Sequence, residues 1–271
     1  MTTSSVSSYL FLMRTFRNWF VLMQNLRHGG YLEGGPIREQ LVFWDGRRVA
    51  HPPDRSGLAA ILLEIWHHNV YRLGEFYQPR PGDVIADVGA HVGLFSLRVL
   101  YQAPWSRIVA FEPSPENFSC LKHNLLDFVS NGQVDIHNLA IGPEFGKIAM
   151  MEIESNRSFD ARTMPAGAKD IGTVEMVPLS RVLELAGTEE LALLKMDVEG
   201  AEEGTFSAVD TGLVRRIQRL AMEYHDNLVP GTLSILRRRL SPTHELTILP
   251  DPGAGHGRLF AVRKDLVSER R

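Results

Sequence analysis

A glycine-spaced turn after a short apolar strand is the first feature of this chain that could do chemistry. It reads Asp87-Val-Gly-Ala-His-Val-Gly93. Glycine lets the backbone pass close to a ligand and to the following helix. The helix N-terminus presents unpaired N–H groups and a positive dipole end, which suit an anionic or polar ligand. We therefore predict that the turn binds a cofactor through Asp87, Gly89, Ala90, His91 and Gly93.

An acidic residue at the end of the next apolar strand fits a ribose. Glu112 closes the segment Arg107–Glu112, lies 25 residues after Asp87 and is followed by Pro113. An acid at about this distance can bind both ribose hydroxyls, so Glu112 and Pro113 predict a nucleoside cofactor without naming it. The spacing Gly89-x-x-x-Gly93 departs from the G-x-G-x-x-G turn of dinucleotide-binding proteins. It is closer to the turn that holds S-adenosylmethionine in Rossmann-like methyltransferases.

Three side chains at later strand ends could supply acid–base chemistry. Asp197 follows the apolar segment Leu191–Met196, and Glu223 and His225 close the segment that begins at Ile217. The carboxyl ends of parallel strands form the ligand edge of an open sheet. A histidine can deprotonate a hydroxyl near neutral pH. We predict Asp197, Glu223 and His225 as catalytic residues, and the sequence leaves open whether Asp197 or His225 is the base.

A metal is the alternative use of these acids. Oxygen and nitrogen donors of this kind suit Mg²⁺ or Mn²⁺. Their spacing is not diagnostic of a metal site, so a divalent metal is compatible with the sequence but is not predicted. The candidate donors are Asp197, Glu199, His225 and Asp226.

Four segments in register resemble the successive motifs of the FkbM-type methyltransferases. They are Asp87–Gly93, Phe111-Glu-Pro-Ser-Pro-Glu-Asn117, Leu121-Lys-His-Asn-Leu125 and Leu194-Lys-Met-Asp-Val-Glu-Gly-Ala-Glu202. The resemblance runs from about Pro81 to Lys264 and implies a class I fold, S-adenosylmethionine as cofactor, and methyl transfer mainly to hydroxyl oxygens. It also implies an acid and a histidine at the end of the fifth strand. His91 stands where the family more often has Asn, and both residue types tolerate unusual turn geometry.

The elements that must position these residues alternate between strand and helix. Such an order predicts a parallel sheet with right-handed crossovers. An antiparallel pair then completes a mostly parallel, Rossmann-like seven-stranded sheet with helices on both faces. Asn138 and Ala140, at the end of the third strand, are predicted to contact adenine. The predicted strands are 83–88, 107–112, 134–140, 191–196, 217–223, 246–249 and 259–262, and the predicted helices include 92–103 and 115–129.

The first part of the chain is predicted to form a helical and hairpin extension. We predict two domains, an N-terminal cap over residues 1–78 and a methyltransferase domain over residues 79–271. A hairpin is predicted about Asp45-Gly46 and a helix over residues 58–71. The apolar segment 9–23 contains Arg14 and Arg17 and is too short and too charged to span a bilayer. It either packs on the core or on a second subunit, which would make a homodimer, or it contacts a membrane surface peripherally.

The charge and cysteine content of the chain limit which binding partners and which cellular compartment we expect. The net charge is −3, which provides no basic field for nucleic acid. The single cysteine, Cys120, cannot form an internal disulfide, and this is typical of a reducing cytoplasm. We therefore predict a cytoplasmic enzyme, membrane-peripheral if the N-terminal segment binds lipid.

The sequence predicts an S-adenosylmethionine-dependent O-methyltransferase acting on a hydroxyl of a sugar, a glycolipid or a polyketide-like metabolite. The alternative is an NAD(P)-dependent oxidoreductase with a Rossmann-type domain, against which the glycine spacing counts. The acceptor pocket is expected to be shaped by the cap and by a loop over residues 155–172. Neither segment identifies the acceptor.

Overall fold

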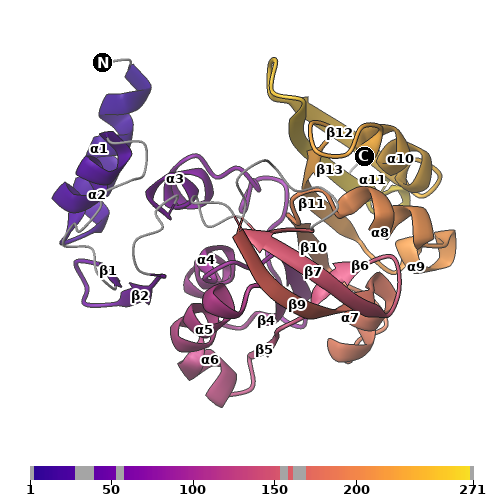
Figure 1. The fold of residues 1–271 in the computed structure, drawn as a ribbon, viewed down its shortest axis with the longest axis horizontal. Coiled ribbons are helices and arrows are strands. Elements are labelled where there is room, and N and C mark those ends of the chain that lie inside the picture. Colours follow the sequence, from indigo (N-terminus) through magenta and orange to yellow (C-terminus); the bar gives the residue numbers. More distant parts are fainter. Residues whose placement is uncertain (1–2, 28–39, 53–57, 153–157, 161–168, 269–271) are drawn as a thin grey trace.

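A seven-stranded sheet in the order β12-β13-β11-β10-β3-β4-β5 forms the centre of the molecule (Figure 1). The computed structural model describes residues 3–27, 40–52, 58–152, 158–160 and 169–268. Neighbouring strands are parallel except that β13 runs antiparallel to both β11 and β12. This confirms the predicted Rossmann-like sheet. The strands are β3 (Val84–Val88), β4 (Arg107–Phe111), β5 (Val134–His137), β10 (Leu193–Met196), β11 (Arg219–His225), β12 (His244–Pro250) and β13 (His256–Arg263).

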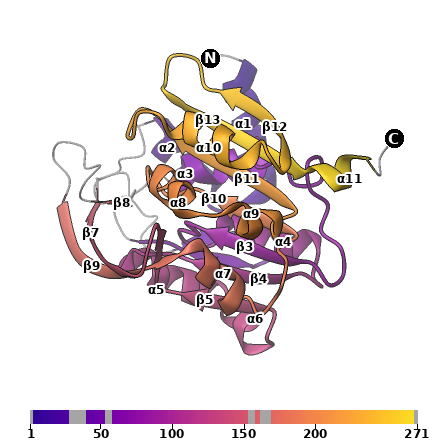
Figure 2. The same cartoon turned by 90° about the vertical axis from the view of Figure 1, so that its right-hand side faces the viewer.

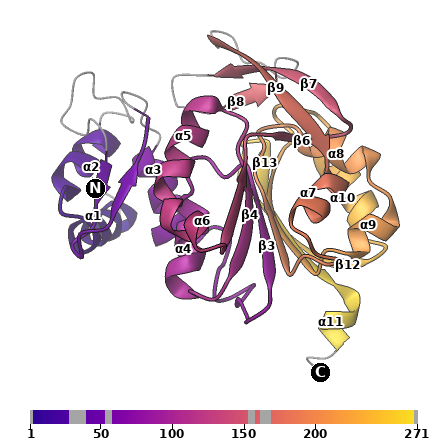
Figure 3. The same cartoon turned by 90° about the horizontal axis from the view of Figure 1, so that it is seen from below.

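Helices cover both faces of the sheet, as Figure 3 shows with the sheet seen on edge. One apolar cluster, which includes Leu97 and Leu121, fills one side, and a second, which includes Val182 and Phe206, fills the other. All four residues of β10 are buried, as expected for a parallel strand covered on both faces. One face carries α4 (Leu94–Gln102), α5 (Pro115–Asn124) and α6 (Leu126–Ser130); the other carries α7 (Leu179–Leu185), α8 (Glu202–Ala208), α9 (Thr211–Arg215) and α10 (Thr232–Leu240), while α11 (Lys264–Ser268) follows β13.

The third core strand ends earlier than predicted. It stops at His137, because the side chain of Asn138 turns back and donates hydrogen bonds to the carbonyl oxygens of Glu112 (2.8 Å) and Pro113 (2.9 Å). Ala140 therefore does not end this strand but begins β6 (Ala140–Gly142) in a second sheet. The predicted helix over residues 115–129 is likewise broken at Leu125 into α5 and α6.

The second sheet has the order β6-β9-β7-β8 and arches over one end of the central strands (Figure 2). It contains β7 (Gly146–Glu152), β8 (Ser158–Asp160) and β9 (Lys169–Pro178). Strand structure at residues 158–160 and 169–172 corrects the predicted loop over 155–172, since β7 supplies antiparallel backbone partners to both segments. Residues 153–157 and 161–168 lie outside the described residues.

The N-terminal extension packs beside α4 and α5 at one end of the molecule (Figure 1). Its apolar core is continuous with that of the central domain, and it buries Leu12, Phe16 and Leu22. The predicted hairpin about Asp45-Gly46 is formed. The division into domains at residue 78 stays a prediction. The elements are α1 (Thr3–Thr15), α2 (Trp19–Arg27), β1 (Gln40–Val42), β2 (Arg48–Ala50), α3 (Leu58–Leu62) and a π-helical turn η1 (Leu63–His67).

Two expected helices of the extension are interrupted. The predicted helix over 58–71 ends at His67, because Asn69 has a φ of +53° and its side chain bonds both backbone groups of Leu73. The apolar segment 9–23 divides into α1 and α2, because Asn18 bonds the backbone of the β1 strand instead of continuing a helix. Within the described segments, every helix is too short or too polar to cross a bilayer.

Gly89 sits where two strand ends meet at very close range. Its φ is +72°, and a Cβ atom placed there would lie 1.7 Å from the carbonyl oxygen of Asp197. The Gly89 and Ala90 amides both donate to the Phe111 carbonyl, at 3.0 and 2.9 Å. The turn after β3 is thus fixed against its neighbours on both sides, and only glycine fits.

Replacing Gly89 with alanine should destabilise the protein through this clash. We expect Gly89→Ala to lower the free energy of unfolding by about 1–3 kcal/mol more than Gly132→Ala. Gly132 is the matched control, since its φ is +78° but a Cβ atom added there would have no other atom within 4 Å. Urea denaturation followed by circular dichroism measures both. Equal losses in the two variants would show that backbone strain alone, and not contact with Asp197, requires glycine.

Candidate active site

A pocket opens at the carboxyl ends of the central strands. Together with the open solvent at its mouth, it encloses about 1170 Å³. Its floor comes from the ends of β3, β4, β10 and β11, one wall from β6 and β7, and another from α3, η1 and Tyr71. Of the predicted site residues, Gly89, Ala90, His91, Glu112, Pro113, Ala140, Asp197 and Glu223 line it.

Glu112 lies in the pocket wall with its carboxylate held by three protein donors. The His91 amide donates to Oε2 at 2.8 Å, and the Ser114 amide and the Asn117 side chain donate to Oε1 at 3.0 and 3.4 Å. Burial raises the pKa of Glu112 to about 7, against these hydrogen bonds, which lower it. A carboxylate offers about four acceptor positions. Three protein donors therefore leave room for a ligand hydroxyl.

His91 contributes its backbone to this arrangement. Its φ is +53°, a left-handed conformation that histidine and asparagine adopt more readily than most other residues. Gly93, with a φ of +89°, begins α4 and packs against Leu121, to which a Cβ atom would approach within 2.9 Å. Gly93 thus sets the helix position and does not line the pocket.

Asp87 and Asn138 also stand behind the pocket surface. Asp87 is fully buried and accepts a hydrogen bond from the Ser96 hydroxyl at 2.7 Å. Its other carboxylate oxygen lies 3.2 Å from the ammonium of Lys195. Asn138 braces the turn after β4 through the two carbonyls described above. Both residues hold the cofactor turn in shape and leave ligand contact to their neighbours.

Lys195 is a pocket residue that sequence reasoning passed over. It is 3% exposed, and its ammonium donates to the Gly89 carbonyl at 2.6 Å and the Val88 carbonyl at 3.3 Å. The available signal was a lysine inside the apolar run Leu193-Leu-Lys-Met196, since buried lysines are almost always paired. It ties the end of β10 to the end of β3.

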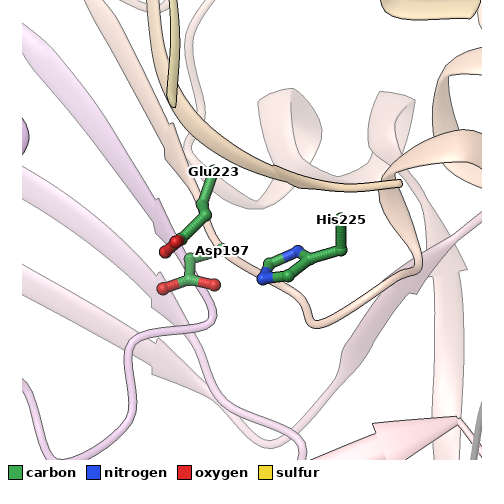
Figure 4. Close-up of side chains that lie close together, drawn as sticks. All are labelled: Asp197, Glu223 and His225. Atoms are coloured by element: carbon green, nitrogen blue, oxygen red, sulfur yellow. The ribbon is translucent and has the colours of Figure 1, made fainter. Parts of the chain in front are cut away.

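The three predicted catalytic residues converge at the end of β10 and β11. Figure 4 shows Asp197, Glu223 and His225 pointing toward one another. One ligand atom from each lies within 4.8 Å of the others. The hydroxyl of Tyr71, from the N-terminal extension, donates to Asp197 Oδ2 at 3.0 Å. Tyr71 is 126 residues away in sequence, and no local motif marks it.

His225 is held between two acids. Its Nδ1 lies 2.8 Å from Oε1 of the fully buried Glu202, and its Nε2 lies 3.4 Å from Glu199 Oε2. Burial lowers the pKa of His225, but the Glu202 hydrogen bond and the charges of Glu202, Glu199 and Asp197 outweigh it and raise that pKa to about 10. The imidazole is therefore a cation at neutral pH and has no lone pair with which to take a proton.

Glu223 has a pKa close to the pH at which a base would have to work. Burial and the charge of Asp197 raise the pKa of Glu223 to about 8, and the charge of His225 opposes them. A general base works best when its pKa lies near the operating pH. Among the three converging residues, Glu223 fits that condition, with Asp197 beside it as a second acceptor.

The same three side chains could also hold a divalent cation. A metal ligand must offer a lone pair, so His225 would have to lose its extra proton first; the mixed oxygen and nitrogen donors would then suit Mg²⁺ or Mn²⁺, with Glu202 holding the ring of His225 on the other side. The sequence suggests Asp197, Glu199, His225 and Asp226 as possible metal ligands. In the structure, Glu223 lies with Asp197 and His225 in place of Glu199 and Asp226. Asp226 instead accepts the Leu233 amide near the start of α10, at 3.1 Å.

The paired imidazolium should make stability depend on pH. Because folding raises the pKa of His225 from 6.5 to about 10, its contribution is complete below pH 6.5 and is lost as pH rises toward 10. The difference in free energy of unfolding between wild type and His225→Gln should shrink across that window. Urea melts at a series of pH values measure it, with the exposed His123→Gln as control. A difference that grows with pH would mean that the ring is neutral.

Comparison with known proteins identifies the family of the chain. A family model described as the methyltransferase FkbM domain matches residues 87–240. The chain is 29% identical to the 31-O-demethyl-FK506 methyltransferase FkbM of Streptomyces tacrolimicus, over 73% of this chain and 85% of that one. It is 28% identical to methyltransferase 1 of Beauveria bassiana, over 66% of this chain and 78% of that one. Among solved structures, precorrin-6y C5,15-methyltransferase of Geobacter metallireducens GS-15 aligns with a TM-score of 0.43 at 13% identity, covering 80% of this chain and 94% of that one.

Proposed function

The chain belongs to the FkbM family of methyltransferases, and on that premise we propose that it is an O-methyltransferase that uses S-adenosylmethionine. Its acceptor is a hydroxyl of a sugar, a glycolipid or a polyketide-like metabolite. The observation that carries this proposal is the convergence on one pocket of Glu112, which can bind a ribose, and of the Asp197–Glu223 pair, which can take a proton.

The pocket residues fit this cofactor. Glu112 has a hydrogen-bond acceptor position left for a ribose hydroxyl. The apolar side chains of Leu139 and Ile141 line the pocket and could pack against the adenine ring of the cofactor. The acidic side chains Asp197 and Glu199 also line the pocket, which suits a cationic ligand. When bound, the cofactor supplies a methyl group already activated on a sulfonium. The protein then has to orient the acceptor and exclude water, and alignment of this kind can lower a barrier by roughly 7–11 kcal/mol.

The acidic pair supplies the base. The bound cofactor would supply the methyl group, and the carboxylate of Glu223 would take the proton that the acceptor hydroxyl gives up. Asp197, held by Tyr71, accepts a hydrogen bond from the acceptor and orients it. The imidazolium of His225 partly offsets the charge of both acids.

Family membership favours this function over the NAD(P)-dependent alternative. The name of the Streptomyces relative places its methyl group on an oxygen, which supports a hydroxyl acceptor here.

Cys120, whose thiol is half-buried on α5, supports a reaction in the reducing cytoplasm.

Cofactor binding is the first test. Isothermal titration with S-adenosylmethionine and S-adenosylhomocysteine should show binding to wild type and at least about tenfold weaker binding to Glu112→Gln, since a hydrogen bond to a charged group is lost. The control is Glu144→Gln, an exposed acid outside the pocket lining.

Two results would contradict the proposed cofactor. One is wild-type protein that binds neither sulfur nucleoside. The other is NADH binding that S-adenosylmethionine cannot displace, which would restore the oxidoreductase alternative.

The base is tested by rate and pH together. With an acceptor found by screening hydroxylated glycans and metabolites for S-adenosylhomocysteine release, Glu223→Gln should lower kcat by about 10²–10⁴. Wild-type activity should rise with pH up to about 8, as Glu223 loses its proton, and the variant should lack that rise. Glu245→Gln, an exposed acid on β12, is the control. If Glu223→Gln keeps the rate and Asp197→Asn loses it, the base is Asp197.

A further inference from the structure

Helix α1 is apolar on two opposite faces. Leu12 is fully buried and packs into the core. On the outer side, Val6, Leu10 and Met13 are 48%, 43% and 42% exposed. These three residues are four and three positions apart, so they line up along one side of the helix. Contiguous exposed apolar side chains on a protein surface often mark an interaction site.

Aromatic side chains extend this apolar surface. Trp44, at the tip of the β1–β2 hairpin, is 55% exposed, and its indole N–H donates to the Met13 carbonyl at 2.8 Å. Phe20, 51% exposed, lies on α2, which packs against α1. We call Val6, Leu10, Met13, Phe20 and Trp44 the N-terminal apolar face. Tryptophan with a satisfied N–H and an exposed ring is typical of the boundary between water and an apolar phase.

The charge around the face has one sign. Residues 3–27 contain three arginines and no aspartate or glutamate. Arg14 and Arg17 are exposed, and Arg14 lies one turn beyond Leu10. The nearby acid of the hairpin, Asp45, is paired with Arg47 at 2.5 Å. Apolar side chains flanked by cations complement an anionic lipid surface, whereas a second copy of the same face would bring like charges together.

We propose that the N-terminal apolar face binds anionic membranes peripherally. The face is close to the pocket: Phe11 of α1 stacks on His67 of η1 with ring centroids 4.9 Å apart, and Ser7 Oγ lies 2.9 Å from the same ring. Glu64 and Ile65 of η1 line the pocket. The pocket of the bound enzyme is thus one helix away from the lipid surface, where a lipid-linked acceptor would enter. That last step rests on the proposed function, and membrane binding itself does not.

Vesicle co-sedimentation tests the proposal. Full-length protein should sediment with phosphatidylcholine vesicles that contain phosphatidylserine and should bind vesicles of phosphatidylcholine alone more weakly. The double variant Leu10→Ser/Met13→Ser should bind at least about tenfold more weakly. Arg14→Gln/Arg17→Gln should remove the preference for the anionic lipid and the sensitivity to salt. The matched control is Trp105→Ser, which removes a 54% exposed aromatic outside the face.

Three outcomes would overturn the proposal. They are no binding of wild type to anionic vesicles, an equal loss in Trp105→Ser, or a dimer in light scattering that Leu10→Ser/Met13→Ser dissociates while vesicle binding stays unchanged. Titration of the same variants with S-adenosylmethionine reports on the pocket separately. Failure of vesicle binding with intact cofactor binding therefore rejects the membrane surface and leaves the proposed function in place.

Discussion

The buried ion pair between Lys195 and Asp87 sets the position of the whole site. The two residues are direct register partners on neighbouring parallel strands, and they are 3% and 0% exposed. A buried ammonium is costly unless it is paired and hydrogen-bonded. Lys195 meets that condition through Asp87 and the carbonyls of Val88 and Gly89. The contact fixes the register of β3 and β10 at their carboxyl ends. As a result, the glycine turn after β3 lies against the backbone of Asp197, which follows β10. The glycine turn and Asp197 are therefore placed by the same interaction.

Apart from that pair, the pocket and its surroundings contain more acidic than basic side chains, and protonation of some of these groups lowers the excess negative charge. Burial penalises charge, so Glu223 holds its proton to a pKa of about 8, while His225 keeps a proton to a pKa of about 10 because carboxylates surround it. In both cases a proton is retained: Glu223 becomes a neutral acid and His225 stays a cation. Both shifts therefore reduce the net negative charge of the site. A cationic ligand does the same, so its arrival favours the ionised form of Glu223. Glu223 is then better able to accept a proton when the cationic ligand is bound than when it is absent.

Local patterns in the chain predict the sheet well, and contacts across long separations explain what they miss. Apolar runs and their alternation with helices identify all seven strands, and Glu112, predicted from its spacing to Asp87 to bind a ribose, lies in the pocket wall. Neither pattern could show that Tyr71 reaches Asp197 across 126 residues. The expectation that His225 could be a base used the ordinary pKa of histidine, and no local pattern could show that Glu202, 23 residues away, raises that pKa against the effect of burial. Ala140 belongs to another sheet because one asparagine side chain ends the strand before it.

The extension carries the part of the site that the central sheet leaves open. Its π-helical turn η1 presents Glu64 and Ile65 to the pocket, and Tyr71 reaches the catalytic acid from the same segment. Turns of this type occur often at functional sites, because the extra residue changes which side chains face inward. On the proposed function, the strand ends of the central sheet would bind the cofactor and hold the base, which every acceptor needs. Selection among acceptors must then come from walls that vary independently of the sheet, namely this extension and the second sheet. Since α1 packs directly on η1, the surface that the extension shows to its surroundings and the wall that it shows to the acceptor are two sides of one structural unit.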